Sequence, residues 1–415
     1  MRKPDVKILS NKNIINKKCR KYQRFGLPTI AKTFGFYPYF NIIYSEQEPI
    51  VNMEEREVIM LGSNNYLGMT ANPTVKNAAI NAINDYGSGT TGSRLLNGTF
   101  QIHVELEKRL AKFLGKEDCV IFSTGMQANL GALSSLLTKK DEYVISDELN
   151  HASIIDGILL SKIKKDTKQI YKHNNMEDLR KKIKKVPKGK AMIVTEGIFS
   201  MEGDICPLKE IVEIAQEYKA FIFLDDAHSV GILGPNGRGT AAHFNLTDKI
   251  DVIMGTFSKS FASCGGYIAA SKEICNWVRH TSRAFIFSAS LPPANCATVL
   301  AVLDIIEKNG SYSKKVLDLS NRMKKGLNDA GFNTGNAQTP IIPVIIGKQM
   351  LTFKFFKKLF FRKPHGVFTN PVRPPAVPKG RELLRTSYMA SMNNEIIDEG
   401  VEIFTEVGKK LRIIK

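Results

Sequence analysis

The sequence predicts an α/β protein with a mostly parallel sheet in a large domain and a smaller C-terminal α/β domain. Short β-rich runs alternate with helical stretches through the middle of the chain, which is the pattern of repeated βαβ units. From about Leu300 the pattern changes to long helices with a few short strands. The 415 residues are enough for two such domains. We therefore expect an N-terminal segment (1–55), a large domain (56–300) and a small domain (301–415).

The composition is that of a folded soluble protein, with 43% hydrophobic and 24% charged residues. No apolar run approaches the roughly 18–20 residues that a membrane-spanning helix needs. The basic N-terminus, Met1–Arg24, lacks the apolar core of a secretory signal. The six cysteines are scattered without a C-x-x-C pair. We therefore expect no zinc site, no disulfide framework and a reducing, cytoplasmic location.

The net charge of +19 is the unusual bulk property, and it predicts attraction to an anionic partner without identifying it. Part of the excess lies in Lys162–Lys190, which has twelve basic and three acidic residues and is interpreted as a solvated surface. A second basic segment, Leu351–Phe361, would as a helix separate phenylalanines from lysines. Such a helix either packs into the small domain or lies on an anionic membrane face, and both interpretations stay open.

Polar residues follow three β-rich runs that are typical of buried strands. These runs are Lys190–Glu196, Ala220–Asp226 and Asp251–Thr256. In open α/β sheets, ligands bind beyond the carboxyl ends of the strands. We therefore expect Glu196, Asp225 and the turn Thr256–Lys259 to converge on one crevice.

A glycine-rich run, Gly87–Gly92, satisfies the G-x-G-x-x-G pattern literally. A dinucleotide-binding loop must follow a strand and open a helix. The preceding stretch, Val75–Tyr86, has helical spacing instead. We therefore expect a flexible loop near the site, followed by Ser93 and Arg94, rather than a dinucleotide site.

Lys259 lies in the run Gly255–Ser260, after a predicted strand and between hydroxyl side chains, and the glycine pair Gly265–Gly266 follows. An amine in a desolvated pocket loses its proton readily and becomes nucleophilic, as a Schiff-base lysine requires. Taken alone, a surface lysine is the simpler interpretation. Asp225, 34 residues earlier, favours the Schiff-base lysine instead, because pyridoxal 5'-phosphate (PLP) needs a carboxylate against its pyridine nitrogen. A metal ligand or helix cap is the alternative for Asp225 alone.

Three further segments fit a site that holds PLP and an amino acid. His151 lies in a polar, turn-rich segment, where its imidazole would cover the cofactor ring, although a lone histidine is more often structural. The run Ser123–Asn129 has small residues that let backbone N–H groups reach a phosphate at a helix N-terminus. Arg373 and Arg385 supply guanidinium groups, which bind carboxylates with two parallel hydrogen bonds.

Together these residues resemble the α-oxoamine synthases, PLP enzymes of the aspartate-aminotransferase fold (fold type I). The resemblance runs from about Gly35 to the C-terminus and is closest to the soluble bacterial serine palmitoyltransferases. The stretches that carry it are Gly35–Phe40, Leu61–Gly68, Gly92–Thr99 with His103, Glu196–Asp204 and Phe287–Pro293. The chain departs from the family around Phe353–His365, where the helix has basic residues and no acids before Pro364.

The resemblance implies a role for each matching residue. Lys259 would carry the cofactor as the internal aldimine, with Asp225 on the pyridine nitrogen and His151 stacked on the ring. His228 and Ser200 would lie near the ring hydroxyl. The phosphate would contact Gly125, Met126 and Thr256, together with Ser288 and Ala289 of the other subunit, which implies a homodimer. Arg373 and Arg385 are candidates for the substrate carboxylate.

The implied reaction joins L-serine to a long-chain acyl-CoA or acyl carrier protein thioester with loss of carbon dioxide. The product would be 3-ketosphinganine, the first intermediate of sphingolipid synthesis. The alternatives are another α-oxoamine synthase, such as 8-amino-7-oxononanoate synthase acting on alanine and a pimeloyl thioester, and a plain aminotransferase. Nucleic acid is not an expected partner, because the chain has no recognisable binding module. The sequence leaves the acyl chain length and the thioester carrier open.

Overall fold

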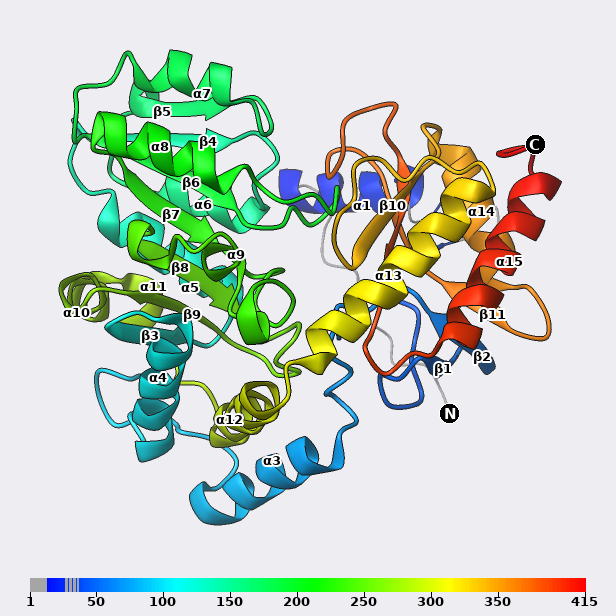
Figure 1. Cartoon of the computed structure of the whole chain (residues 1–415), viewed down its shortest axis with the longest axis horizontal. Helices are drawn as coiled ribbons and strands as arrows, with labels where there is room; N and C mark the ends of the chain where they lie inside the picture. The colour runs from blue at the N-terminus through cyan, green and yellow to red at the C-terminus, as the bar shows by residue number, and fades with distance from the viewer. Residues whose placement is uncertain (1–12, 27–28, 30–31, 33–34, 36) are drawn as a thin grey trace.

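The computed structural model describes residues 13–26, 29, 32, 35 and 37–415. It has a larger lobe around a seven-stranded sheet and a smaller lobe that contains both the C-terminal part and the first strands of the chain (Figure 1). The predicted α/β fold with a mostly parallel sheet is confirmed. Of the expected N-terminal segment 1–55, residues 1–12, 27–28, 30–31, 33–34 and 36 lie outside the described residues.

The large sheet has the strand order β3-β9-β8-β7-β6-β4-β5. Its strands are β3 (Asp118–Phe122), β4 (Tyr143–Asp147), β5 (Lys168–Tyr171), β6 (Ala191–Glu196), β7 (Phe221–Asp225), β8 (Val252–Thr256) and β9 (Gly266–Ala270). The five strands from β8 to β5 run parallel, and β9 is antiparallel to both β8 and β3. The central strands are continuous apolar runs because both faces of the sheet are covered.

Helices cover both faces of this sheet. One face packs against α5 (Gly125–Leu136), α6 (Ala152–Leu160), α10 (Lys272–Thr281) and α11 (Arg283–Ile286). The other packs against α7 (Met176–Ile183) and α8 (Leu208–Tyr218), and beside them α4 (Gln101–Leu114) covers β3 and β9. Short turns of helix lie at α9 (Thr240–His243), η1 (Lys165–Thr167), η2 (Pro235–Gly237) and η3 (Thr247–Lys249).

Two consecutive helices connect the lobes, α12 (Pro293–Lys308) and α13 (Ser311–Asp329), and α12 packs along α3 (Pro73–Tyr86) (Figure 1). The smaller lobe has two three-stranded sheets, β10-β13-β12 and β1-β2-β11. Their strands are β1 (Ile50–Met53), β2 (Arg56–Met60), β10 (Ile341–Ile345), β11 (Gly366–Phe368), β12 (Asn370–Val372) and β13 (Leu383–Ser387), covered by α14 (Gln349–Phe360) and α15 (Asn394–Lys410).

The pairing of β2 with β11 affects where the boundary between the two expected domains, placed at residues 56 and 301, should lie. β2 begins at Arg56, yet it pairs in parallel with β11, so the first strands of the chain lie with the C-terminal lobe. We propose that the large domain begins after β2 and that the smaller one combines both ends of the described chain.

The basic segment Leu351–Phe361 forms most of α14, and its phenylalanines are core residues except for Phe361, which follows the helix and is half exposed. Phe355 is fully buried between the rings of Phe332 and Phe404, with centroids 5.8 and 5.5 Å away. The other apolar residues of the same face are also buried: Phe353, Phe356, Leu359 and Phe360. The interpretation that this face lies in a lipid interface is therefore wrong, and the helix packs into the small lobe.

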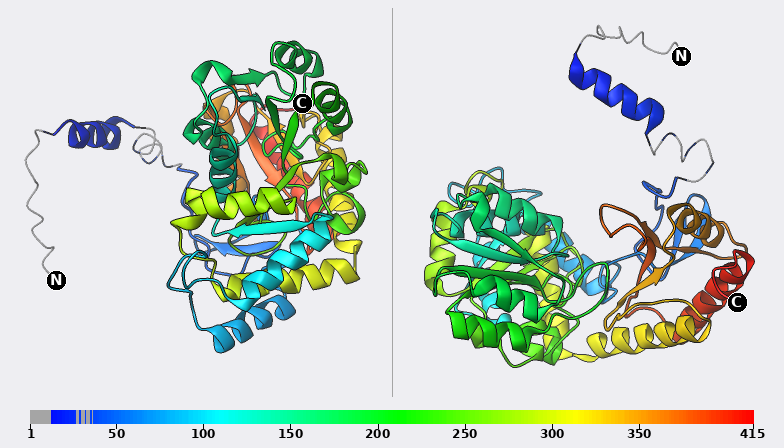
Figure 2. Two further views of the ribbon diagram at one scale, coloured as in Figure 1. Left: turned by 90° about the vertical axis from the view of Figure 1, so that its left-hand side faces the viewer. Right: turned by 90° about the horizontal axis from the view of Figure 1, so that it is seen from above.

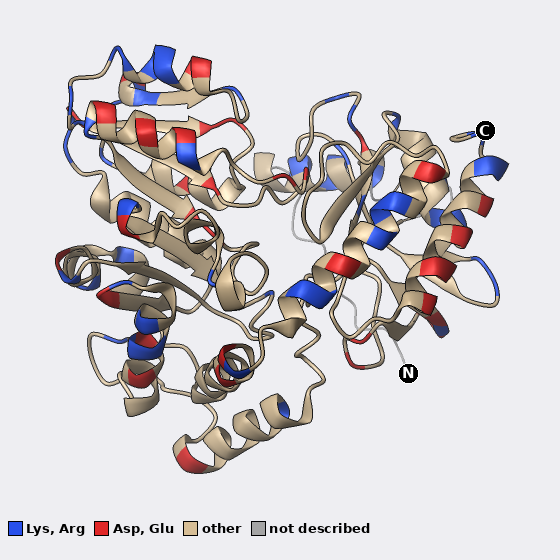
Figure 3. Cartoon of the chain, viewed as in Figure 1, with Lys and Arg blue, Asp and Glu red and all other residues tan. Residues whose placement is uncertain are grey.

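An exposed basic helix is found instead near the N-terminus. α1 (Ile14–Phe25) has no buried residue and projects from the two lobes, with Tyr22 lining a cavity of the smaller lobe (Figure 2). The segment Lys162–Lys190 covers the edge around β5 and α7, where most of its lysines are exposed, as expected for a solvated surface. Lys and Arg are otherwise spread over both lobes and interspersed with acids (Figure 3). Among the described residues, no helix is long and apolar enough to cross a bilayer.

Candidate functional site

The carboxyl ends of β6, β7 and β8 meet at one cavity of about 330 Å³. Glu196 and Asp225 end adjacent parallel strands and are directly paired in the ladder. Thr256 ends β8, and the turn that follows carries Lys259. Glu196, Asp225, Thr256 and Lys259 all line the cavity. The predicted convergence of these three strand ends is confirmed.

The amine of Lys259 lies among the groups that tune its charge. Burial lowers the pKa of Lys259 to about 8, although the nearby carboxylates of Asp225 and Glu196 act in the opposite direction. The positive charge of Arg385 acts in the same direction as burial. A lysine with this pKa releases its proton near neutral pH, so it can act as a nucleophile or as a base.

Asp225 is 4% exposed, and its carboxylate is held on two sides. Asn129 Nδ2 donates to Oδ2 over 2.7 Å, and the backbone N–H of Ala227 donates to Oδ1 over 3.0 Å. Asn129 in turn donates to Ser153 Oγ over 2.9 Å, which ties α5 to α6. These bonds fix the carboxylate in one orientation at the floor of the cavity.

His151 caps the N-terminus of α6 and lies at the exposed side of the cavity. Its backbone N–H donates to Glu196 Oε1 over 2.5 Å, and its Nδ1 is 2.7 Å from Ser153 Oγ. Burial, together with the neighbouring Asp225, raises the pKa of Glu196 well above its usual range, which favours a neutral carboxyl group. Glu196 therefore positions the His151 backbone without adding a full negative charge to the site.

A chain of buried polar groups connects the cavity to the smaller lobe. The Tyr66 hydroxyl is 2.7 Å from His228 Nδ1, and Arg385 Nη2 donates to the same hydroxyl over 3.3 Å. Arg385 Nε donates to the Ser200 carbonyl over 2.5 Å. Burial, and then the charges of Lys259 and Arg385, lower the pKa of His228 well below its usual range, so its imidazole is neutral. The structure thus brings His228, Ser200 and Arg385 together, as predicted.

The N-terminus of α5 opens into the same cavity. Gly125 is the first residue of this helix, and a Cβ there would meet Thr256 Oγ1 at 2.7 Å. A Cβ at Gly266 would meet the Gly125 Cα at 2.5 Å. Glycine at both positions therefore lets the helix end approach β8, with Met126 and the hydroxyls of Thr256 and Ser258 beside it. Free N–H groups and hydroxyls in this arrangement suit a phosphate group.

Five of the predicted site residues do not line the Lys259 cavity of their own chain. Ser200 and Arg385 reach it through Tyr66 and His228, whereas Ser288, Ala289 and Arg373 lie elsewhere. Ser288 accepts a hydrogen bond from Gln127 Nε2 over 3.0 Å, and Ala289 forms a bridge with Ser93. The loop 87–92 lies beside them, with Ser290 N donating to the Gly92 carbonyl over 2.9 Å. Arg373 lines a different cavity in the smaller lobe, where its Nη1 donates to the Pro374 carbonyl over 2.9 Å.

The sequence interpretation missed the residues that hold the site together. Asn129 bonds to the Asp225 carboxylate, and Tyr66 joins His228 to Arg385, but both were noted only as members of longer matching stretches. A polar residue one helical turn after Gly125 was a usable signal for Asn129. Tyr66 has no comparable local signal, because its partners are 162 and 319 positions away.

The residues of the cavity fit PLP. The cavity combines a buried amine with a pKa of about 8, a fixed buried carboxylate and a helix N-terminus with hydroxyls. These are the groups needed by an aldehyde, a pyridine nitrogen and a phosphate, respectively. Lys259, Asp225 and the Gly125–Met126 turn would hold the three ends of the cofactor.

Comparison with known proteins agrees with this assignment. The class I and II aminotransferase family model matches residues 56–404. The serine palmitoyltransferase of Bacteriovorax stolpii is 47% identical over 375 residues, which cover 90% of this chain and 88% of that protein. The 8-amino-7-oxononanoate synthase of Thermoanaerobacter pseudethanolicus is 42% identical over 386 residues, covering 92% and 96%.

A solved structure of SPT (serine palmitoyltransferase) with a PLP internal aldimine has the same fold. It superposes with a TM-score of 0.90 at 34% identity and covers 95% of this chain and 99% of that chain. The chain therefore belongs to the class I and II aminotransferase family of PLP enzymes and, within it, to the α-oxoamine synthases.

Proposed function

We propose that the protein condenses L-serine with a long-chain acyl thioester, with loss of carbon dioxide, to give 3-ketosphinganine. The observation that carries this is the Lys259–Asp225 cavity joined to the buried Arg385, in a chain 43–47% identical to several serine palmitoyltransferases. Arg385 supplies a cation for an amino-acid carboxylate, and the Lys259 amine supplies the base for its α-proton.

When bound, PLP supplies an electron sink that accepts the electron pair left on the α-carbon after a proton or carbon dioxide departs. Asp225 would hold a proton on the pyridine nitrogen of the bound cofactor, because two hydrogen bonds keep its carboxylate in place. Lys259 Nζ takes the α-proton of serine and later returns a proton to the product, for which its pKa of about 8 is suited.

Arg385 orients the amino acid. Its guanidinium is 4% exposed and is anchored through Nε and Nη2, while within the described part of the chain Nη1 makes no hydrogen bond. A substrate carboxylate at Nη1 would place the α-carbon between Arg385 and Lys259. His151, at the open side of the cavity, would stack on the ring of the bound cofactor.

The active form is proposed to be a homodimer in which Ser288 and Ala289 reach the phosphate site of the partner subunit. Large apolar side chains are exposed on and near this segment, which supports a buried interface there: Leu95, Leu96, Met126 and Phe287. Sedimentation of the purified protein would give the mass of two chains. A monomer that retains full activity would contradict this arrangement.

We further propose that the protein is cytoplasmic and makes a loose contact with an anionic membrane face. The support is the net charge of +19 and the exposed helix α1, which has five basic residues beside the exposed Ile14, Ile15, Tyr22 and Phe25. Binding to anionic vesicles that weakens with salt would support it. Equal recovery in the supernatant with anionic and neutral vesicles would contradict it.

Titration of the purified holoenzyme with serine, alanine and glycine tests the amino-acid substrate. We expect serine to shift the absorption of the bound cofactor at lower concentration than the other two. A preference for alanine, followed by ketone formation from pimeloyl thioester, would favour 8-amino-7-oxononanoate synthase, which the relative at 42% identity keeps as the second candidate.

A further inference from the structure

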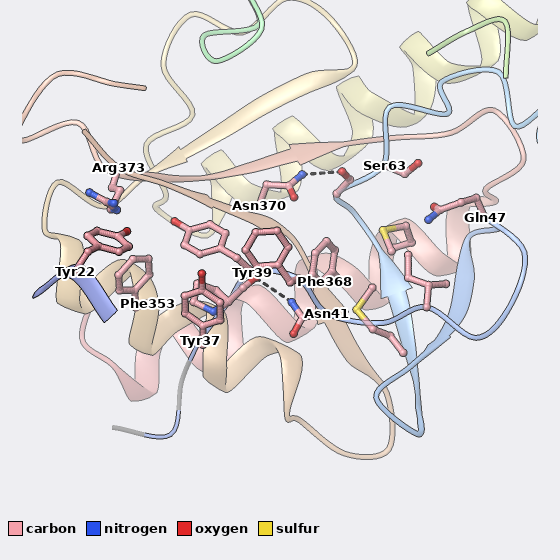
Figure 4. A pocket seen from close by; sticks show the side chains of 16 residues that line it. Tyr22, Tyr37, Tyr39, Asn41, Gln47, Ser63, Phe353, Phe368, Asn370 and Arg373 are labelled. Carbon is pink, nitrogen blue, oxygen red and sulfur yellow. Dashed lines mark hydrogen bonds between the residues drawn. The ribbon is translucent and has the colours of Figure 1, made fainter. Parts of the chain in front are cut away.

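A second cavity, of about 650 Å³, lies in the smaller lobe between the segment Tyr37–Ile43 and the strands β2, β11 and β12. We call it the aromatic groove. Figure 4 shows Arg373, Tyr22 and Phe353 at one end, Gln47 at the other, and the rings of Tyr37, Tyr39 and Phe368 between them. The groove is about twice as large as the Lys259 cavity, at 650 against 330 Å³.

The walls of the groove are apolar and adaptable. The rings form a row, with centroids 6.4 Å apart for Phe353 and Tyr39 and 5.6 Å apart for Tyr39 and Tyr37. Met53 and Met60, both nearly fully buried, add flexible thioether side chains. Among the described lining residues Arg373 is the one charged group, and no acid is present. Such walls suit an uncharged hydrocarbon that has no fixed shape.

The groove lies next to the Arg385 site across the sheet β10-β13-β12. Asn370 lines the groove and is the direct cross-strand partner of Arg385. Directly opposed side chains of antiparallel strands lie on the same face, with Cβ atoms about 5 Å apart. Ser387 Oγ, two residues after Arg385, donates to the carbonyl of the groove residue Ser63 over 2.7 Å. A substrate held at Arg385 is therefore adjacent to the groove.

We infer that the aromatic groove binds the unbranched acyl chain of the thioester substrate and sets the preferred chain length. The inference rests on the proposed function, since it is the condensation that brings an acyl thioester to Arg385 and Lys259. The volume lies within the range of roughly 300–1,000 Å³ that is usual for small-molecule sites. Arg373 lies at one end of the groove and donates one of its N–H groups to the Pro374 carbonyl, and the rest of the described lining offers no counterion for a chain that ends in a carboxylate.

The kinetic test uses the holoenzyme, saturating serine and acyl-CoA substrates of increasing chain length. Wild-type KM falls by up to about fourfold for each CH₂ added while the chain still enters the groove. Tyr39→Ala removes part of the wall and raises KM for palmitoyl-CoA about tenfold. The KM for octanoyl-CoA and the kcat for both substrates change little. Tyr39→Phe keeps the ring and the wild-type values. Tyr44→Ala, a 61% exposed tyrosine outside the groove, is the matched control.

Two results would overturn the assignment. One is a chain-length dependence that Tyr39→Ala leaves unchanged, and the other is a preference for pimeloyl-CoA over palmitoyl-CoA. The serine-induced change in cofactor absorption is recorded in every variant, so a failure to bind serine identifies a fault in the proposed function instead. Photolabelling of the holoenzyme with a palmitoyl-CoA that carries a terminal diazirine then tests the groove without turnover. The label should fall near Tyr39, Met60 or Phe353, and a label elsewhere contradicts the inference.

Discussion

The carboxylate of Asp225 is fixed by Asn129 and by the Ala227 backbone before any ligand binds. We expect Asp225→Asn to retain the fold and bind PLP but to lose at least about a hundredfold in kcat, because a neutral amide cannot hold the pyridinium proton. Asp251→Asn, just before the start of the neighbouring strand β8 and outside the cavity, is the control and should keep turnover near wild type. Steady-state kinetics measures kcat for both variants, and the absorption spectrum of the cofactor checks that each is loaded with PLP. A near wild-type rate in the Asp225 variant would remove this residue from its assigned role.

Lys259 is the amine that lines the cavity with Asp225 and Glu196. Reduction of the holoenzyme with borohydride should fix the cofactor on this side chain irreversibly. Peptide mapping would then find the phosphopyridoxyl group on the peptide that contains Lys259. Finding the phosphopyridoxyl group on any other lysine would contradict the assignment of Lys259 as the cofactor-binding residue.

His173 lies between two carboxylates outside the cavity, with Nδ1 3.0 Å from Asp147 and Nε2 2.9 Å from Asp204. Burial alone would lower its pKa, but the bonds to Asp147 and Asp204 outweigh burial and raise the pKa of His173 to about 10. In the unfolded chain the pKa is about 6.5. Its contribution to stability is therefore complete below about pH 6.5 and is lost as the pH rises towards 10.

We expect His173→Gln to lower the free energy of unfolding by about 2–3 kcal/mol at pH 6. The difference from wild type should shrink as the pH approaches 10, where the wild-type imidazole loses its proton in the folded protein. Urea denaturation of both proteins at equal cofactor loading across this range measures it. A difference that does not vary with pH would show that His173 acts through packing alone, for example against Phe199.

At the scale of elements, strands with two buried faces were predictable from the sequence. β6, β7 and β8 lie within one residue of the predicted bounds, because strands buried on both faces are continuous apolar runs that end where the sheet ends. The helix over Val75–Tyr86 before the glycine run is also confirmed as α3. The polar residues at three strand ends then located the cavity, since adjacent parallel strands end at the same edge.

For α14, the sequence pattern did not distinguish between two possible environments of the helix. Its pattern of phenylalanines and lysines is the same for a core helix and for a membrane-surface helix, because periodicity does not state what covers the apolar face. The covering residues Phe332 and Phe404 come from the loop after α13 and from α15.

The packing of α14 predicts a large loss of stability when a side chain in the centre of the helix is shortened. We expect Phe355→Ala to lower the free energy of unfolding by about 3–5 kcal/mol, because it leaves a cavity between two rings. Phe361→Ala, which removes a ring that is 48% exposed, should cost much less. Chemical denaturation compares the two variants. Equal losses would contradict the buried placement of Phe355.

At the scale of the whole molecule, contacts between distant segments are what the sequence could not predict. β2 pairs with β11 across about three hundred residues, and Tyr66 reaches both His228 and Arg385. The two arginines expected at one carboxylate also separate, with Arg385 beside the Lys259 cavity and Arg373 in the aromatic groove. Each contact joins segments that are far apart in the sequence, and no local pattern encodes it.

The central claim is a decarboxylating condensation on serine. The most direct measurement incubates the holoenzyme with palmitoyl-CoA and L-serine labelled with ¹³C in the carboxyl group, and follows both products by mass spectrometry. We predict labelled carbon dioxide and unlabelled 3-ketosphinganine in equal amounts, and neither product from the Lys259→Ala variant. Transfer of the amino group without release of carbon dioxide, or ketone formation from alanine faster than from serine with every acyl thioester, would contradict the account.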